Sequence, residues 1–160
     1  MKNGSRLLFL LMLFSIGIFS VSCDEGGEDT TEEETQLNKL KGTWTLQSVN
    51  NDGDDRTDEY PGMTLTISGT YSSGGTYNYT SVATSWPSVS PWNDIDTWKF
   101  KSDAVTTVVV RQSDLQNMTY QLSNNDNTLQ VSFDYPSSEP GFNNGRVEKV
   151  DGSWSFTFSK

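Results

Sequence analysis

Histidine is absent from the 160-residue chain, and cysteine occurs once, as Cys23. A single cysteine excludes an internal disulfide, and the missing histidines exclude both a Ser-His-Asp triad and a zinc site of cysteine and histidine ligands. After Cys23 the sequence has no thiol nucleophile. Because these absences remove most common catalytic designs, we expect a protein that is not an enzyme and that carries no cofactor or metal.

Basic residues are scarce: 11 lysines and arginines stand against 21 aspartates and glutamates, which gives a net charge of −10 at pH 7. Seven of the acidic residues lie between Asp24 and Glu34. Proteins that bind DNA or RNA neutralise phosphates with lysine and arginine, and the sequence has no basic stripe of that kind. We therefore expect no nucleic-acid partner.

The sequence also lacks an apolar run long enough to cross a bilayer. The longest largely apolar run, residues 7–19, has 13 residues, whereas a membrane-spanning helix needs roughly 20. Lys2 and Arg6 precede this run, and small residues follow it. This order is typical of a secretory signal peptide, so residues 1–22 are predicted to be one.

The segment Ser20-Val21-Ser22-Cys23 resembles the lipobox of bacterial lipoproteins. The resemblance implies that Cys23 is acylated, for example with palmitate, and anchors the chain to a lipid bilayer. The alternative is an ordinary secretory signal that is cleaved near Ser22. Lipidation would place the protein in the cell envelope, on the outer or the periplasmic face of the outer membrane.

Residues 23–37 are predicted to be the lipidated cysteine followed by an acidic tether. Residues 24–36 contain no aliphatic or aromatic side chain, so they cannot bury apolar surface and are expected to be disordered. A short helix over residues 35–40 would lead into the folded domain, residues 38–160.

The domain contains eight segments in which apolar and polar residues alternate with a period of two, separated by turns rich in Gly, Asn and Asp. The segments are residues 43–49, 63–68, 76–82, 97–101, 105–111, 118–122, 129–135 and 154–158. Residues 105–111 are more uniformly apolar, which predicts a strand buried on both faces. The pattern predicts an all-β domain, an eight-stranded antiparallel up-and-down β-barrel or a β-sandwich. Residues 146–150 are expected to be a short helix or an extra strand.

The segment Gly42-Thr43-Trp44, at the start of the first strand, resembles the Gly-X-Trp signature of lipocalins. Together with the strand count and the aromatic last strand, it makes residues 38–160 similar to lipocalin-like lipoproteins of the Bacteroidota type. The resemblance implies an up-and-down barrel with Trp44 packed across its closed end. A basic residue, Arg111 or Arg146, would lie over Trp44. The function implied is binding of a small apolar or aromatic-stacking ligand.

A long connection, residues 84–96, contains Trp86 and Trp92, and Tyr60 is expected at the same end of the barrel. Exposed tryptophans offer flat apolar faces to a ligand or a partner; alternatively the segment is a lid over the barrel. If the interior is filled by side chains, the protein is instead an accessory subunit of an envelope complex, for example one that handles glycans. A hydrolase that uses paired carboxylates such as Asp94 and Asp96 is the remote alternative.

The segment Asn50-Asn51-Asp52-Gly53-Asp54-Asp55 spaces its oxygen donors like a calcium-binding loop. However, Asp55 stands where such a loop needs glycine, and Pro61 stands where it needs glutamate. A polar turn between two strands is therefore the favoured interpretation.

Overall fold

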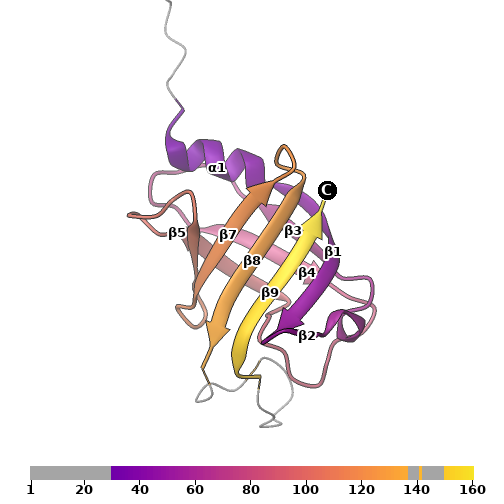
Figure 1. The fold of residues 1–160 in the computed structure, drawn as a ribbon. Coiled ribbons are helices and arrows are strands. Elements are labelled where there is room, and N and C mark those ends of the chain that lie inside the picture. Colours follow the sequence, from indigo (N-terminus) through magenta and orange to yellow (C-terminus); the bar gives the residue numbers. More distant parts are fainter. Residues whose placement is uncertain (1–29, 137–140, 142–149) are drawn as a thin grey trace, which may run out of the picture.

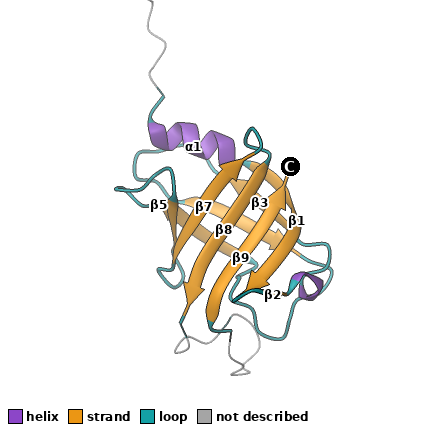
Figure 2. Cartoon of the chain, in the orientation of Figure 1, coloured by secondary structure: helices purple, strands orange, loops and turns teal. Residues whose placement is uncertain are grey.

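The computed structural model describes residues 30–136, 141 and 150–160, which form a barrel of antiparallel strands with one helix across an end (Figure 1). The elements, in chain order, are α1 (Glu32–Leu40), β1 (Gly42–Asn51), β2 (Asp54–Asp55), the 3₁₀ helix η1 (Thr57–Glu59), β3 (Thr64–Ser68), β4 (Tyr77–Val82), β5 (Ile95–Phe100), β6 (Val108–Arg111), β7 (Asn117–Ser123), β8 (Thr128–Tyr135) and β9 (Gly152–Ser159). Figure 2 shows how strands dominate this part of the chain.

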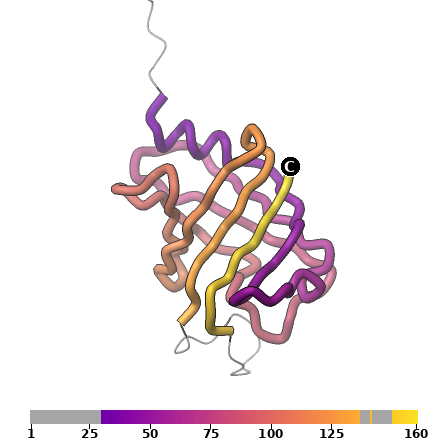
Figure 3. Tube along the Cα trace, viewed as in Figure 1, coloured from indigo at the N-terminus to yellow at the C-terminus, as the bar shows by residue number. Residues whose placement is uncertain are grey.

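The sheet closes on itself. From β3 to β9 each strand pairs with the next along the chain, and β1 pairs with both β3 and β9. The first and last strands therefore lie side by side, although they are furthest apart in sequence (Figure 3). The two-residue β2 pairs only with the end of β1. This closure confirms the eight-stranded up-and-down barrel and excludes the β-sandwich.

Period-two alternation places one face of each strand inside the barrel. In β9, Trp154, Phe156 and Phe158 are buried, and Ser155 and Thr157 between them are half-buried. Each of the eight predicted segments overlaps one strand of the barrel. The prediction that residues 105–111 are buried on both faces is wrong: the strand begins at Val108, and residues 108–110 are half-buried. A barrel has only one interior, so no strand needs two apolar faces.

Helix α1 begins earlier than the sequence pattern predicts. A helix is predicted over residues 35–40, but residues 32–34, expected to be disordered, also lie in it. The side chain of Thr31 accepts a hydrogen bond from the backbone N–H of Glu34 at 3.1 Å, which caps the first turn. Leu37 and Leu40 are buried against the barrel end, so packing offsets the poor apolar content of the segment.

The Gly-X-Trp segment joins this helix to the barrel. Gly42 has φ +123°, a left-handed conformation that side chains rarely adopt. Trp44 is fully buried, and its indole N–H donates to the carbonyl of Leu40 at 2.8 Å. The tryptophan thereby provides a hydrogen-bond donor to a carbonyl at the C-terminus of the helix, and its ring fills the end of the barrel.

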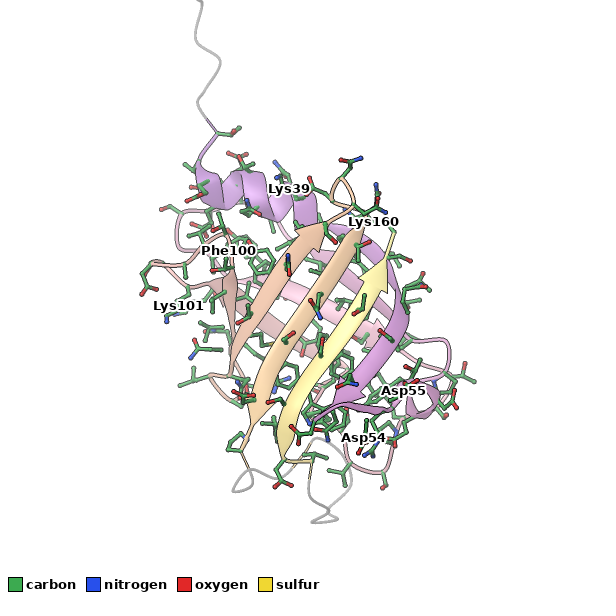
Figure 4. All side chains as sticks on the ribbon, viewed as in Figure 1. Lys39, Asp54, Asp55, Phe100, Lys101 and Lys160 are labelled. Atoms are coloured by element: carbon green, nitrogen blue, oxygen red, sulfur yellow. The ribbon has the colours of Figure 1, made fainter. Side chains whose placement is uncertain are left out.

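The basic residue over Trp44 is Lys160, whose ammonium nitrogen lies 4.3 Å from the ring centroid. Its ammonium also donates to the carbonyl of Lys39 at 2.7 Å, and Figure 4 shows both lysines at this end of the barrel. The prediction of Arg111 in this role is wrong, because its guanidinium lies over Phe133 at 5.5 Å. Arg146 lies outside the described residues.

Other predictions also fall on residues that are not described: the signal peptide, Cys23, the tether before residue 30 and the segment 146–149. Within the described ranges, no helix is both long enough and apolar enough to cross a membrane.

We predict that Leu37→Ala lowers the free energy of unfolding by about 3 kcal/mol, because it leaves a cavity where α1 packs on the barrel. Leu115→Ala is the matched control, since Leu115 is 69% exposed and should change stability by at most about 0.5 kcal/mol. Urea denaturation followed by tryptophan fluorescence measures both. Equal effects of the two changes would show that α1 does not belong to the folded unit.

Candidate functional site

The end of the barrel opposite α1 is here called the mouth. Figure 4 shows Asp54 and Asp55 of β2 at this end, away from Lys39 and Lys160. The connections from β1 to β3, from β4 to β5 and from β6 to β7 also reach it (Figure 1). Three separate stretches of sequence therefore converge on one end of the barrel.

Part of the β4–β5 connection enters the barrel at this end. Residues 89–92, here called the plug, have the sequence Val-Ser-Pro-Trp and are all buried, whereas Thr84 and Ser85 before them are exposed. Trp92 is only 2% exposed. Gly141 lies so close to Val89 that a side chain at position 141 would collide with it. The plug is thus packed as part of the interior.

The indole of Trp92 lies among four aromatic rings of the barrel wall. Its centroid is 4.7 Å from that of Phe156, and the other three rings follow at 5.7 Å (Tyr79), 5.9 Å (Phe158) and 6.2 Å (Phe133). The interplanar angles are between 43° and 52°. Aromatic pairs at these separations attract one another beyond their simple burial. The surroundings of Trp92 therefore suit a flat aromatic group.

Hydroxyl groups hold the plug from one side. The indole N–H of Trp92 donates to the hydroxyl of Ser81, which points inward from β4, at 2.9 Å. The hydroxyls of Tyr60 and Ser90 are 3.2 Å apart, and the Ser90 hydroxyl also accepts from the backbone N–H of Trp92. Burial raises the pKa of Tyr60 to about 12, so its phenol is neutral at physiological pH.

Arg111, at the end of β6, holds the plug by its backbone. This guanidinium is fully buried, and its Nη1 donates to the carbonyl of Pro91 at 2.9 Å. Its Nε and Nη2 donate to the two carboxylate oxygens of Asp114, at 3.0 and 2.5 Å. A buried charge is tolerated only when it is paired in this way, so Asp114 fixes Arg111 for its contact with the plug.

Arg111 is ion-paired within the site, with Asp114. Burial is the largest single effect on Arg111 and opposes its charge, but the interactions with Asp114 and Tyr79 together outweigh it, so the pKa of Arg111 is raised above its ordinary value. Burial also raises the pKa of Tyr79, against a smaller opposite effect of Arg111. The guanidinium is therefore cationic, the phenol is uncharged, and the charge of Arg111 is balanced by its carboxylate partner.

Beyond Trp92 the interior contains an apolar cavity of about 40 Å³. Its wall reaches from Trp92 to Leu40 at the helix end and includes Ile67, Val109 and Met118. Ligand pockets usually measure about 300–1,000 Å³. With the plug in place, the barrel is therefore filled by its own side chains.

The predicted ligand residues Tyr60, Trp86 and Trp92 do lie close together. The ring of Tyr60 is 6.0 Å from that of half-buried Trp86 and 5.4 Å from Phe156, which also contacts Trp92. Of the two alternatives left open for this connection, the geometry is that of a lid. The sequence pattern gave no signal for Ser81, and it predicted a different position for Arg111. The signal for Arg111 at this site is one charged residue that ends an apolar run, Val108–Arg111.

The carboxylates considered for other chemistry take part in local structure. Asp96 accepts from the backbone N–H of Thr97 at 2.7 Å and from the hydroxyl of Ser113, and Asp94 is exposed. In the calcium-like segment, Asn50 accepts from the N–H of Gly53 at 2.9 Å. Among the described residues, no group of three or more Asp, Glu, His or Cys side chains is placed to hold a metal ion.

The fold and its interior define a class: a closed eight-stranded up-and-down β-barrel with an aromatic core, consistent with a lipocalin-like fold. Comparison with protein-family models, with curated proteins and with solved structures finds no match for this chain.

We predict that Asp114→Ala lowers the free energy of unfolding by about 3 kcal/mol, because it leaves the buried guanidinium of Arg111 without its counter-ion. Asp103→Ala is the control: Asp103 pairs with Lys101 at 3.9 Å and is 74% exposed, so its loss should cost at most about 0.5 kcal/mol. Denaturant titration of both variants checks this. Similar small losses would mean that Arg111 does not depend on Asp114.

Proposed function

We propose that this protein is a non-catalytic, membrane-anchored lipocalin-like binding protein whose ligand enters the barrel through the mouth and displaces the plug. The ligand is small and apolar or aromatic-stacking. The observation that carries the proposal is the position of Trp92, a side chain from a connection that occupies the barrel interior.

The plug differs from the wall around it in how it is held. The wall is joined by backbone hydrogen bonds along every strand pair, from β1–β3 through β8–β9 and β1–β9. The plug is hydrogen-bonded to the rest of the described residues through three side chains: Ser81 and Arg111 of the wall, and Tyr60 of the β1–β3 connection. Exchanging such bonds for bonds to a ligand leaves the strand pairing intact, so the barrel can open without unfolding.

Anchoring through Cys23 is compatible with this orientation. Helix α1, which follows Cys23 in the sequence, lies at the end opposite the mouth (Figure 1). An acylated Cys23 would then direct the mouth away from the bilayer, toward solutes. This arrangement supports a receptor or carrier in the cell envelope, with the bilayer as one partner and the small ligand as the other.

We predict that the full chain binds a neutral apolar dye such as Nile red, and that Trp92→Ala binds it more tightly. Removing the indole opens the interior and abolishes competition from the plug. Trp86→Ala should weaken binding, because it removes an aromatic face at the mouth. Dye fluorescence titrations measure all three dissociation constants.

Val82→Ala is the control for this experiment, since Val82 is 62% exposed on the outside of β4. Its dissociation constant should equal that of the parent chain. Unchanged binding in both tryptophan variants would contradict the placement of the ligand site at the plug.

A second candidate function, an accessory subunit of an envelope complex, is favoured by one observation. Three large apolar side chains are exposed near the mouth: Val82 (62%), Ile95 (63%) and Leu115 (69%). Leu115 also has φ +60°, a conformation that is unfavourable for leucine. A strained, exposed leucine is more readily explained by contact with another protein than by stability.

This second function predicts that the protein co-purifies with defined envelope proteins from native membranes. Leu115→Asp should abolish the association and Leu115→Met should retain it, because only the former removes the apolar contact. Loss with both variants, or with neither, would contradict a docking role for Leu115.

A further inference from the structure

We infer that the plug occupies the place of the ligand and reveals its chemistry: the ligand is a neutral aromatic amide, with a flat ring that carries an N–H donor and a short link to a carbonyl oxygen. This inference rests on the proposed function and specifies the ligand. It is derived from the groups that the plug contacts in the barrel.

The shape of the site selects a ring. The four aromatic side chains around Trp92 form a slot, with Phe156 nearest at 4.7 Å between ring centroids. A flexible aliphatic chain of equal volume would lose the ring–ring attraction that these neighbours offer. The adjoining cavity of about 40 Å³ adds space for about one water-sized substituent. The ring is therefore close to indole in size.

The hydroxyl of Ser81 selects a donor on the ring. Ser81 is 3% exposed, and its oxygen accepts the indole N–H of Trp92 at 2.9 Å. When Trp92 leaves, this buried hydroxyl loses its partner unless the ligand replaces it. Sites that bury a polar group discriminate strongly against molecules that leave the group unpaired. An N–H on the ring meets this requirement.

The guanidinium of Arg111 selects a carbonyl oxygen. Its Nη1 donates to the Pro91 carbonyl, while Nε and Nη2 donate to the carboxylate of Asp114. One donor is thus released when the plug leaves. Because Asp114 already balances the charge of Arg111, a ligand carboxylate would add an uncompensated negative charge beside it. A neutral amide or ketone oxygen fits better than an acid.

The spacing of the two polar contacts determines how many atoms join the carbonyl of the ligand to its ring. The Pro91 carbonyl and the Trp92 indole belong to consecutive residues, so an amide nitrogen and two carbons join carbonyl to ring. N-acetyltryptamine has the same sequence of atoms: a carbonyl, an amide nitrogen, two carbons and an indole. It is therefore the probe that reproduces the plug most directly.

Three matched molecules separate the requirements. 1-Methyl-N-acetyltryptamine lacks the ring N–H, indole-3-butyrate replaces the amide by a carboxylate, and N-hexylacetamide keeps the amide but lacks the ring. Isothermal titration of the full chain should give the tightest binding for N-acetyltryptamine. Each of the other three should bind at least about tenfold more weakly, as expected when a buried partner or the ring is lost.

Two variants test where the probe binds. Trp92→Ala should bind N-acetyltryptamine more tightly than the parent chain, because the plug no longer competes. Trp44→Ala, which removes a buried indole at the other end of the barrel, should not. Ser81→Ala is a milder change that should reduce the preference for N-acetyltryptamine over its 1-methyl analogue to about one. It keeps the test open if the tryptophan variants fail to fold.

The outcomes distinguish the two proposals. Tightest binding of indole-3-butyrate or N-hexylacetamide, with the effect of Trp92→Ala as expected, would overturn the ligand class and leave the proposed function intact. Binding that Ser81→Ala does not affect would overturn the donor requirement and with it this inference. If none of the probes, and no apolar dye, binds the parent chain, the plug is a permanent part of the core and both proposals are wrong.

Discussion

The pairing of β1 with β9 is the constraint on which the rest of the structure depends. It runs from Thr45 opposite Ser159 to Asn51 opposite Trp154, with one irregularity between Leu46 and Ser48. Once eight strands close, the interior is just wide enough for side chains or one small ligand. Around Trp92 that space is lined with aromatic rings, and deeper in the barrel it is lined with aliphatic side chains as well. In this chain Trp92 of the plug occupies that space. A ligand can enter the closed barrel only if the plug leaves it.

The barrel could be predicted from the sequence because its determinants are local. Alternation with a period of two marks a strand regardless of its neighbours, and turns rich in Gly, Asn and Asp separate the strands. The start of α1 was harder to predict. Residues 32–36 are polar, and their helical state depends on Thr31 as a cap and on Leu37, which packs against a barrel formed by residues far along the chain.

The site could be predicted only in part, for the same reason. Tyr60, Trp86 and Trp92 stood out as aromatic residues in connections, and they do lie together at the mouth. That Trp92 turns inward depends on contacts with Ser81 and Arg111, which no spacing in the sequence indicates. Likewise, the basic residue over Trp44 is Lys160. It reaches Trp44 because β9, the strand that closes the barrel, ends beside α1.

The central claim is that the plug opens independently of the barrel wall, and hydrogen exchange of the indole N–H groups tests it most directly. Trp44 and Trp92 both donate buried hydrogen bonds of similar length, 2.8 Å to Leu40 and 2.9 Å to Ser81. NMR of the full chain should show the Trp92 proton exchanging much faster, through a local opening that changes little with denaturant. The Trp44 proton should exchange only with global unfolding. Equal rates for the two protons, with the same denaturant dependence, would contradict the account.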